Sequence, residues 1–421
     1  MSYHKKLTIG LFGFGVVGEG LYRVLQQTPS LNASLKKVCI KNPEKQRNAP
    51  SELFTTDKNV LLNDTEINVI VEVINETEPA FEIVSTALKN GKDVVSASKK
   101  MIAEHLEELL RLQRVTGNSL LYEAAACASI PVIRNLEEYY DNDLLHSIKA
   151  IVNGSTNFIL TKMFEEKLDF RNALLQAQQA GFAESDPKLD IEGFDALNKW
   201  TLLLTHAYGI IENPENILFN GIQNINAEDA VIANEKDQQI KLVAEAKKLQ
   251  NGKVAAFVLP QFVKQNDHLA FVKQEYNGVV IESNFADKQF FYGKGAGSFP
   301  TASAVLSDIS ALRYGYKYEY KKLYHHLPLE LSNEVYLRVY ISFDNWDDVP
   351  REEFEWIEEY HAGERRNYLI AVISFEKLKT NDWWKENNIS LILTPDAVIE
   401  DIELRKLKKK SLELAGVELF G

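Results

Sequence analysis

The sequence feature that most constrains the fold is the segment Gly13-Phe-Gly-Val-Val-Gly18, near the start of the chain. A short apolar run leads into it, and an apolar pattern with helical spacing follows. A GxGxxG sequence between a strand and a helix is typical of dinucleotide-binding folds. Gly13 permits the tight turn, Gly15 lets the backbone approach the pyrophosphate, and Gly18 allows close helix–strand packing. The pyrophosphate would lie at the helix N-terminus, where free N–H groups favour an anion. We predict that the loop binds the cofactor through Gly13, Phe14, Gly15, Val16, Val17 and Gly18.

The sequence after this loop alternates between strand and helix patterns. Strands are predicted at 37–40, 68–73, 93–96 and 120–123, and helices at 79–90 and 103–116. Alternation of this kind predicts an α/β Rossmann domain with a doubly wound parallel sheet.

The end of the second predicted strand bears on the choice of cofactor. An acidic residue there would read the ribose hydroxyls of NAD. The sequence is Ile40-Lys41-Asn42-Pro43 instead, and Lys41 could pair with a 2′-phosphate. We therefore expect NADP, with NAD as the alternative, and Lys41 could also be an ordinary solvent-facing lysine.

An acidic segment, Gly181–Lys199, carries residues suited to proton transfer. Five carboxylates precede Lys199, and Asp195 and Lys199 are four residues apart in a predicted helix. Carboxylates can orient a lysine and stabilise its charged form. We expect Lys199 to be protonated in the resting site and to act first as an acid. A solvated acidic loop is the alternative interpretation.

Charge and composition exclude several classes of function. The formal net charge of −13 argues against nucleic acid or an anionic membrane as a partner. Two cysteines provide neither a disulfide framework nor a metal-binding spacing. No apolar run approaches the ~20 residues that span a bilayer. The first residues run into a strand, so no signal peptide is expected. These features predict a soluble cytoplasmic protein.

Several further segments place chemistry-bearing residues at predicted strand ends and turns. With the segments above, they closely resemble the homoserine dehydrogenase family from the start of the chain to about residue 320. Family members show a GFGxVG loop, a strand ending in T-x-NK, and YEA…IP, NGTTNYIL, GYAE…K and GAGxxPTASAV segments. The matching segments here are Gly13–Gly18, Ser96–Lys99, Tyr122–Pro131, Asn153–Leu160, Gly181–Lys199 and Gly295–Val305.

The resemblance implies NAD(P)-dependent interconversion of L-homoserine and L-aspartate 4-semialdehyde. It implies that Lys199 is the general acid/base and that Asp195 orients it and helps to hold the substrate. Lys99 would assist catalysis or cofactor binding. The remaining implied contacts are Glu184, Asp190, Asn153 and Thr156 for the substrate and Gly297 for the cofactor. Asn153 and Thr156 are expected to shape a turn beside the substrate, and His206 is expected to be a packing residue.

The resemblance also implies a site for a monovalent cation such as Na⁺ or K⁺. Its ligands would be Glu123 and the carbonyl oxygens of Ala126, Ala128 and Ile130, a donor set that suits a hard cation. Residues 126–129, Ala-Cys-Ala-Ser, depart from the Val-Ala-Gly-Gly that is common in relatives. The loss of both glycines would alter the geometry of this turn.

Three regions are expected along the chain. The dinucleotide domain would occupy 1–130 and be completed by 300–325. An α+β substrate and dimerisation domain would occupy 131–299, with helices at 172–180, 196–208 and 237–248 and strands at 147–152, 255–260 and 279–283. Residues 330–421 would form a degenerate ACT-like regulatory or accessory tail, with strands at 334–343, 366–375 and 390–393 and helices at 351–360 and 381–386.

The sequence therefore predicts a homoserine dehydrogenase that works mainly as a semialdehyde reductase in threonine and methionine biosynthesis. The resemblance of the middle sheet to a dimer interface predicts a homodimer or homotetramer. Two alternatives remain at this point: another amino-acid dehydrogenase, such as L-aspartate dehydrogenase, and a catalytically silent NADP-binding regulatory protein.

Overall fold

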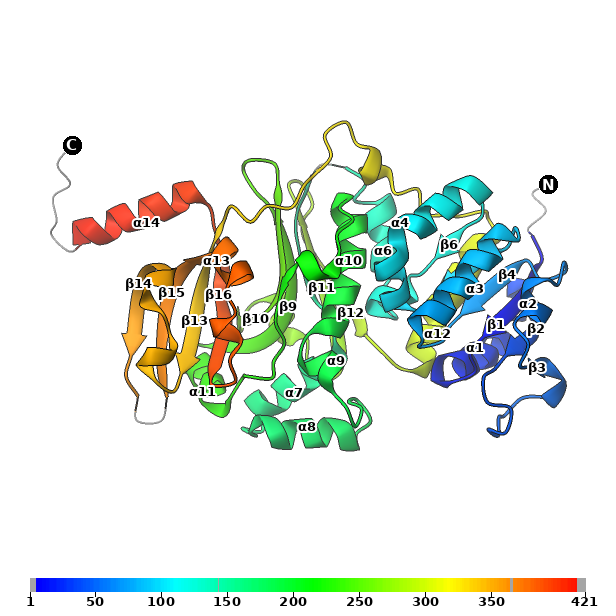
Figure 1. Ribbon diagram of the computed structural model, residues 1–421, viewed down its shortest axis with the longest axis horizontal. Helices are drawn as coiled ribbons and strands as arrows, with labels where there is room; N and C mark the ends of the chain where they lie inside the picture. Colours follow the sequence, from blue (N-terminus) through cyan, green and yellow to red (C-terminus); the bar gives the residue numbers. More distant parts are fainter. Residues whose placement is uncertain (1–4, 143, 364–365, 415–421) are drawn as a thin grey trace. The chain divides into compact units, whose positions relative to one another are not determined.

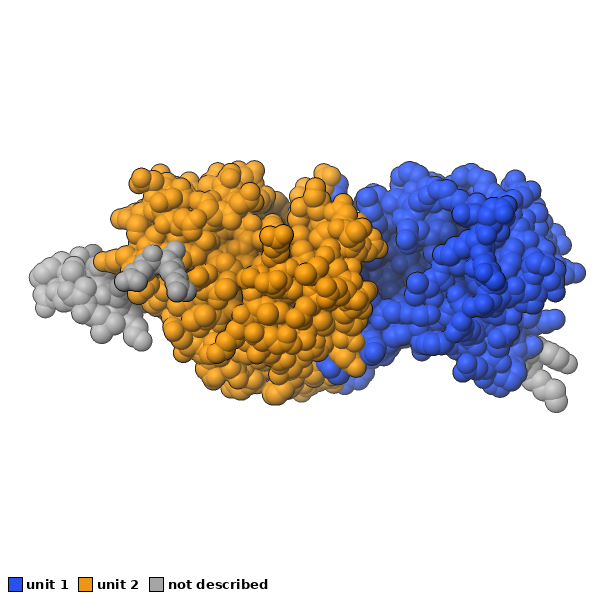
Figure 2. All heavy atoms as spheres, turned by 90° about the horizontal axis from the view of Figure 1, so that it is seen from below, with its two compact units in different colours: residues 1–144, 198–214, 291–328 blue, residues 145–197, 215–290, 329–421 orange. Residues whose placement is uncertain are grey.

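The computed structural model describes residues 5–142, 144–363 and 366–414. Its chain divides into two compact units, each built from three stretches of sequence (Figure 2). Unit 1 is formed from residues 1–144, 198–214 and 291–328, and unit 2 from residues 145–197, 215–290 and 329–421. Among the described residues, no helix has the length and hydropathy needed to span a lipid bilayer.

Unit 1 contains a six-stranded parallel sheet with the strand order β3-β2-β1-β4-β5-β6. Its strands are β1 (Leu7–Phe12), β2 (Ala33–Cys39), β3 (Phe54–Thr55), β4 (Val69–Glu72), β5 (Asp93–Ser96) and β6 (Leu120–Leu121). The order is that of a Rossmann fold, in which the dinucleotide lies at the carboxyl ends of β1 and β4, where the order reverses. The predicted fold class of this region is confirmed.

The first four helices of unit 1 lie between these strands in the chain, and the other three follow β6. They are α1 (Val16–Gln27), α2 (Asn59–Leu62), α3 (Thr77–Lys89), α4 (Lys99–Thr116), α5 (Ala124–Cys127), α6 (Val132–Glu138) and α12 (Ser298–Leu312). Although α12 is far along the chain, it packs on α1. A Cβ at Gly20 would lie 2.5 Å from Oγ of Ser298, and this hydroxyl donates to the carbonyl oxygen of Val16 at 2.7 Å.

Unit 2 is built on a large mixed sheet with the order β12-β11-β7-β9-β10-β16-β13-β15-β14, in which β8 also pairs with β10. The strands are β7 (Leu145–Ile151), β8 (Leu218–Phe219), β9 (Gln238–Lys248), β10 (Val254–Lys264), β11 (Tyr276–Ser283), β12 (Asp287–Lys294), β13 (Tyr336–Phe343), β14 (Phe354–His361), β15 (Asn367–Ser374) and β16 (Ile389–Ile399). The helices of the middle region are α7 (Gly154–Glu165), α8 (Phe170–Gln179), α9 (Lys188–Ile191) and α11 (Ala227–Glu235), and those of the tail are α13 (Phe375–Thr380) and α14 (Asp401–Leu414). Helix α10 (Phe194–Tyr208) and strand β12 both begin among the residues of unit 2 and continue among those of unit 1.

The helix predicted at 237–248 is wrong, because this segment forms strand β9. The segment is rich in Lys, Ala, Glu and Gln, which are common in helices. However, β7 and β10 pair with it on both sides, and eight consecutive residues of the strand are buried. Pairing and burial in the centre of the sheet override the intrinsic preference of the segment.

The helix predicted at 351–360 is also wrong, since this segment is a short 3₁₀ turn followed by strand β14. The pairing of β14 with β15 contains two bulges, one on each side of Trp356 and Ile357. The bulges place Phe354 and Ile357 against the same apolar core. Their spacing of three residues imitates a helical pattern, which explains the error.

The tail is part of unit 2 (orange to red in Figure 1). Strands β16, β13, β15 and β14 form an antiparallel arrangement, and β16 pairs in parallel with β10. Helix α11 contacts the same strands, because Oδ1 of Asp229 accepts hydrogen bonds from Ser342 at 2.6 Å and Tyr340 at 3.2 Å. The predicted boundary at residue 330 therefore does not separate two compact units.

Candidate active site

The glycine loop has the geometry that a dinucleotide requires. Gly13 has φ = +95°, a left-handed conformation, and a Cβ there would lie 2.9 Å from the carbonyl oxygen of Val73. A Cβ at Gly18 would lie 2.2 Å from the carbonyl oxygen of Gly13. A Cβ added at Gly15 would have no heavy atom of the described residues within 4 Å, apart from those of its two neighbours in the chain. The loop is therefore closed on its protein side and open at Gly15, which precedes helix α1.

Basic residues follow β2, where the ribose of a dinucleotide would be read. Lys41 is exposed and forms an ion pair with Glu76. Arg47, which the sequence analysis missed, lies with its guanidinium 5.5 Å from the centroid of the Phe54 ring. Phe54 contacts Phe14 of the glycine loop edge-on, at 5.1 Å between ring centroids. The signal that could have identified Arg47 is a second cation six residues after Lys41.

Lys99 is the first residue of α4, directly after the turn that follows β5. A buried carboxylate, Glu72, lies at the end of the neighbouring strand β4; it accepts a hydrogen bond from Ser96, the last residue of β5, and lies within hydrogen-bonding distance of the hydroxyl of Ser98 in this turn. Glu72 was also missed from the sequence. Its signal is an acidic residue that ends an otherwise apolar strand.

In unit 2, the structure brings together three residues that the sequence predicted for the substrate site. Nδ2 of Asn153 donates to Oδ1 of Asp190 at 2.7 Å and to Oδ2 of Asp195 at 2.8 Å. The side-chain oxygen of Asn153 caps α7 by accepting from the backbone N–H of Thr156 at 2.8 Å. Because both amide hydrogens and the amide oxygen are used, Asn153 has one orientation, and it holds two carboxylates beside one another.

Glu184 and Thr156 have different surroundings. The loop that carries Glu184 is tied to the start of α7, since Oγ of Ser155 donates to the carbonyl oxygen of Phe182 at 2.5 Å. The side chain of Glu184 is exposed. Thr156 is fully buried, and its hydroxyl donates to the carbonyl oxygen of Asn153 at 3.0 Å. It therefore supports the Asn153 turn, as the sequence analysis expected, and presents no surface to a ligand.

Helix α10 carries both Asp195 and Lys199, one turn apart. Its start is fixed by close backbone packing, because a Cβ at Gly221 would lie 1.8 Å from the carbonyl oxygen of Ile191. Lys199 is buried, with 8% of its surface exposed.

His206 lies further along α10 and is fully buried. Its ring nitrogens contact Glu137 at 2.6 Å and the hydroxyl of Tyr122 at 2.8 Å. The prediction that His206 is a satisfied packing residue is confirmed.

Glu123 is at the turn for which a cation site was predicted. Its carboxylate accepts backbone hydrogen bonds from Ile133 at 2.7 Å and Arg134 at 3.0 Å, at the start of α6. Burial raises the pKa of Glu123, and these hydrogen bonds oppose the rise. Each carboxylate oxygen accepts one of these bonds and keeps a further lone pair, so Glu123 stays a predicted ligand together with the backbone oxygens of the turn. Ala128, in the middle of the turn, has φ = +44°, a conformation that favours glycine.

Gly297 precedes α12 and has φ = +116°. It lies directly before Ser298, the residue that contacts α1. Through this contact, the predicted cofactor residue Gly297 belongs to the same packed region of unit 1 as the glycine loop.

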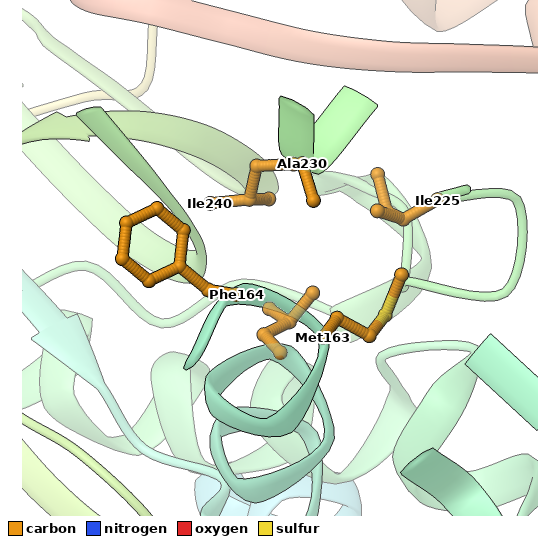
Figure 3. A pocket seen from close by; sticks show the side chains of 6 residues that line it. Met163, Phe164, Ile225, Ala230 and Ile240 are labelled. Carbon is orange, nitrogen blue, oxygen red and sulfur yellow. The ribbon is translucent and has the colours of Figure 1, made fainter. Parts of the chain in front are cut away.

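Two other features of the described residues are separate from these groups. A small cavity in unit 2 is lined by residues with apolar side chains and by no ionisable group (Figure 3); they are Leu160, Met163, Phe164, Ile225, Ala230 and Ile240. In unit 1, Glu78, Glu104 and His105 gather at the surface, but none of them was predicted as a ligand.

Comparison with known families identifies two regions of the chain. Residues 13–123 match the family described as "Homoserine dehydrogenase, NAD binding domain", and residues 131–310 match the family described as "Homoserine dehydrogenase".

Individual relatives give the same result. The homoserine dehydrogenase of Synechocystis sp. is 36% identical over 311 residues, which are 72% of each chain. That of Corynebacterium glutamicum is 34% identical over 357 residues, 81% of this chain and 80% of the relative. The crystal structure of a homoserine dehydrogenase from Thiobacillus denitrificans covers 93% of this chain and 98% of its own, with a TM-score of 0.81 and 27% identity. A hyperthermophilic archaeal homoserine dehydrogenase in complex with NADPH covers 75% of this chain, with a TM-score of 0.63 and 27% identity.

Proposed function

The chain belongs to the homoserine dehydrogenase family, whose members interconvert L-homoserine and L-aspartate 4-semialdehyde, and we propose that it works mainly as an NADPH-dependent reductase of the semialdehyde. The observation that carries this proposal is the pair of carboxylates that Asn153 holds together, on the segment that leads into the helix of Lys199. An acidic group of this kind suits a substrate that bears an α-ammonium group.

The residues of the chain have separate roles in the proposed reaction. The bound dinucleotide would supply a hydride to the carbonyl carbon of the substrate. Negative charge then develops on the carbonyl oxygen, and the ammonium group of Lys199 stabilises this charge and donates a proton to the oxygen. In the reverse direction, neutral Lys199 accepts the proton of the homoserine hydroxyl. Asp195 orients Lys199, and Glu184 and Asp190 bind the polar ends of the substrate.

The residues around the glycine loop fit a dinucleotide. Gly15 is open where a pyrophosphate would approach the start of α1, and the first turn of a helix of this length favours an anion. Lys41 and Arg47 are cations placed after β2, and they support a preference for a 2′-phosphate. Lys99, at the start of α4, would contact the nicotinamide side of the cofactor or the substrate.

Substitution of Lys199 tests the proposed reaction. Lys199→Ala should lower kcat for NADPH oxidation with aspartate semialdehyde by about 10²- to 10⁴-fold, because a positioned general acid contributes that much. Lys199→Arg keeps the positive charge but not a transferable proton, so it should also be strongly impaired. Lys162→Ala removes a lysine from α7 and is the control, with expected wild-type kinetics. Absence of wild-type activity would refute the enzyme, and an active Lys199→Ala would refute the role of Lys199.

The same assay tests the cofactor and the tail. We expect a higher kcat/KM with NADPH than with NADH, and Lys41→Ala and Arg47→Ala should reduce that ratio. Added threonine tests a feedback role of the ACT-like tail.

The proposed cation site has a direct test as well. If Glu123 and the backbone oxygens around Ala128 bind Na⁺ or K⁺, activity measured in choline chloride should rise when NaCl or KCl replaces it at constant ionic strength.

The proposed homodimer or homotetramer is tested by light scattering, which measures the mass of the assembly in solution.

A further inference from the structure

Glu72 is a fully buried carboxylate at the carboxyl end of β4, the strand next to β1 at the point where the strand order reverses. In the sheet it lies opposite Phe12, the last residue of β1, and Ser96, the last residue of β5. It is therefore placed between the strand that leads into the glycine loop and the strand that leads to Lys99.

Hydroxyl groups of the turn after β5 satisfy this carboxylate. Oγ of Ser96 donates to Oε2 of Glu72 at 2.6 Å, and Oγ of Ser98 lies 2.8 Å from Oε1. The backbone N–H of Ser98 donates to Oγ of Ser96 at 3.1 Å, and that of Ala97 donates to the carbonyl oxygen of Glu72 at 3.1 Å. Ser96 and Ala97 are thus bonded to Glu72 directly, the hydroxyl of Ser98 lies within hydrogen-bonding distance of it, and the next residue is Lys99.

The orientation of Ser98 is informative. Ser98 is at the N-cap position of α4, where a serine hydroxyl ordinarily accepts a hydrogen bond from the first turn of its helix. Here Ser98 makes no such bond. Its hydroxyl instead lies 2.8 Å from Oε1 of Glu72 and 2.7 Å from the carbonyl oxygen of Ile74. The contact with β4 has replaced the local cap, so the start of α4 is fixed by its neighbour in the sheet.

A further hydrogen bond of Glu72 fixes the backbone that lies against the glycine loop. Oε1 of Glu72 accepts from the backbone N–H of Ile74 at 2.7 Å, which folds the segment 72–74 around the carboxylate. Gly13 lies against this segment, since a Cβ there would meet the carbonyl oxygen of Val73 at 2.9 Å and the side chain of Ile74 at 3.1 Å. One carboxylate therefore connects the turn of Lys99 with the backbone that supports the dinucleotide loop.

The absence of a cation makes this arrangement unusual for a buried acid. Among the described residues, no lysine, arginine or histidine forms an ion pair with Glu72, and its carboxylate is satisfied by hydroxyls and one backbone N–H. Burial raises the pKa of Glu72, and the bonds from Ser96, Ile74 and Ser98 partly offset the rise. Burying a carboxyl group in this way is costly, and a fully satisfied polar network specifies one arrangement of the segments that it joins.

We propose that Glu72 is a positioning residue, which acts through Ser96 and Ser98 to hold Lys99 in register with the glycine loop. The inference rests on the proposed role of Lys99 in the reaction. Lys99 touches the reactants in that proposal, whereas Glu72 does not.

A double-mutant cycle tests the inference. Ser98→Ala removes one hydroxyl and should lower kcat for semialdehyde reduction about tenfold, because small displacements of a catalytic group are costly to the rate. Ser98→Thr keeps a hydroxyl and should restore most of the activity, while Ser96→Ala and Glu72→Gln should be impaired in the same direction. In a Lys99→Ala background, Ser98→Ala should have no further effect, since it acts through Lys99.

Ser85→Ala is the matched control. Ser85 is a buried serine of unit 1 whose hydroxyl bonds to the carbonyl oxygen of Glu82 on α3, remote in sequence from the Lys99 turn. Its loss should leave kcat unchanged. The melting temperature of every variant shows whether a loss of activity comes from unfolding or from a displaced Lys99.

The outcomes distinguish the inference from the proposed function. An equal loss from Ser98→Ala in both backgrounds, or wild-type kinetics for Ser98→Ala and Ser96→Ala, would overturn the inference. An unaffected Lys99→Ala would overturn the role of Lys99, and a wild-type protein that does not reduce the semialdehyde would overturn the function itself.

Discussion

One amide nitrogen, Nδ2 of Asn153, holds the two aspartates that we propose for the substrate site. Two carboxylates repel each other, and the shared donor, Nδ2 of Asn153, offsets part of this repulsion. Asn153 also caps helix α7, which fixes the direction of the amide. A single residue therefore determines both the local fold and the spacing of the acidic groups.

Substitution of Asn153 should affect substrate binding more than the fold. Asn153→Ala removes two charge-assisted hydrogen bonds, each worth about 1.5–3 kcal/mol, so kcat/KM for the semialdehyde should fall at least about tenfold. Asn226→Ala is the matched control, because Asn226 caps α11 in the same unit by the same type of bond. It should lower stability by about 1 kcal/mol and leave the kinetics unchanged. Equal kinetics for both variants would contradict the proposed role.

Ala128 provides a stability prediction. A non-glycine residue at φ = +44° and ψ = −105° is strained. Ala128→Gly should raise the free energy of unfolding by about 1 kcal/mol in urea titrations. Ala125→Gly, at a buried helical position, should lower it by a similar amount. A destabilised Ala128→Gly would show that the turn is relaxed in the wild type.

Sequence alone could predict only those site residues that lie in a motif. The glycine loop, Asp190, Asp195 and Lys199 lie in segments whose spacing is specific, and the comparisons confirm the family that these segments indicated. Glu72 was missed because its partners are distant in sequence, 24 residues in the case of Ser96. Residues that meet because their strands are neighbours in a sheet leave no pattern in the local sequence.

At the scale of elements, four strands of the parallel sheet of unit 1 (β1, β4, β5 and β6) were predicted from short apolar runs, whereas β2 was predicted only from residue 37 on and the two-residue β3 was not predicted. The two errors, β9 and β14, are both strands of unit 2 that were taken for helices. In β9 the helix-forming residues include Lys241 and Glu245, which are buried between neighbouring strands. Alternation of polar and apolar residues disappears when both faces of a strand are covered, so the periodicity that identifies a strand was missing.

Lys241 on β9 makes the stability of unit 2 depend on pH. Burial lowers the pKa of Lys241 to about 7, with Nζ donating to the carbonyl oxygen of Val272 at 2.6 Å and to Asn157 at 3.0 Å. Between pH 7 and about pH 10, the unfolded chain holds a proton that the folded chain has released, so stability should rise with pH over this range.

The urea midpoint of the wild type should therefore increase across this range relative to that of Lys241→Met, which cannot titrate. Lys264→Met, an exposed position on β10, is the control and should follow the wild type. A constant difference between the wild type and Lys241→Met would show that Lys241 keeps its proton throughout.

At the scale of the whole molecule, the tail is joined to unit 2 by a shared apolar core. Phe257 and Leu259 of β10 pack in the same cluster as Ile341 of β13 and Leu393 of β16. A regulatory domain attached by a linker would have a core of its own. The tail therefore contributes to the fold of unit 2, whatever ligand it binds.

Truncation should distinguish a structural tail from a detachable one. A chain that ends at Leu329 loses β13 to β16 and exposes the apolar face of β10, so it should be insoluble or melt far below the wild type. Tyr360→Ala, an exposed position on β14, is the control and should melt like the wild type. A truncated chain with full activity and an unchanged melting temperature would contradict a shared core.

The position of β16 also has a consequence for the synthesis of the protein. This strand ends at Ile399, yet it lies inside the sheet of unit 2, between β10 and β13. On the ribosome, β7 to β10 emerge long before the strand that covers the open side of β10. Strand β8 pairs with part of this edge, at Phe257 and Val258, but the part around Gln261, which pairs with β16, stays exposed and able to pair with other chains until nearly all of the protein has been translated. Chaperones that shield unpaired strands should therefore engage nascent chains of this enzyme late, after residue 264 and before residue 399 has emerged.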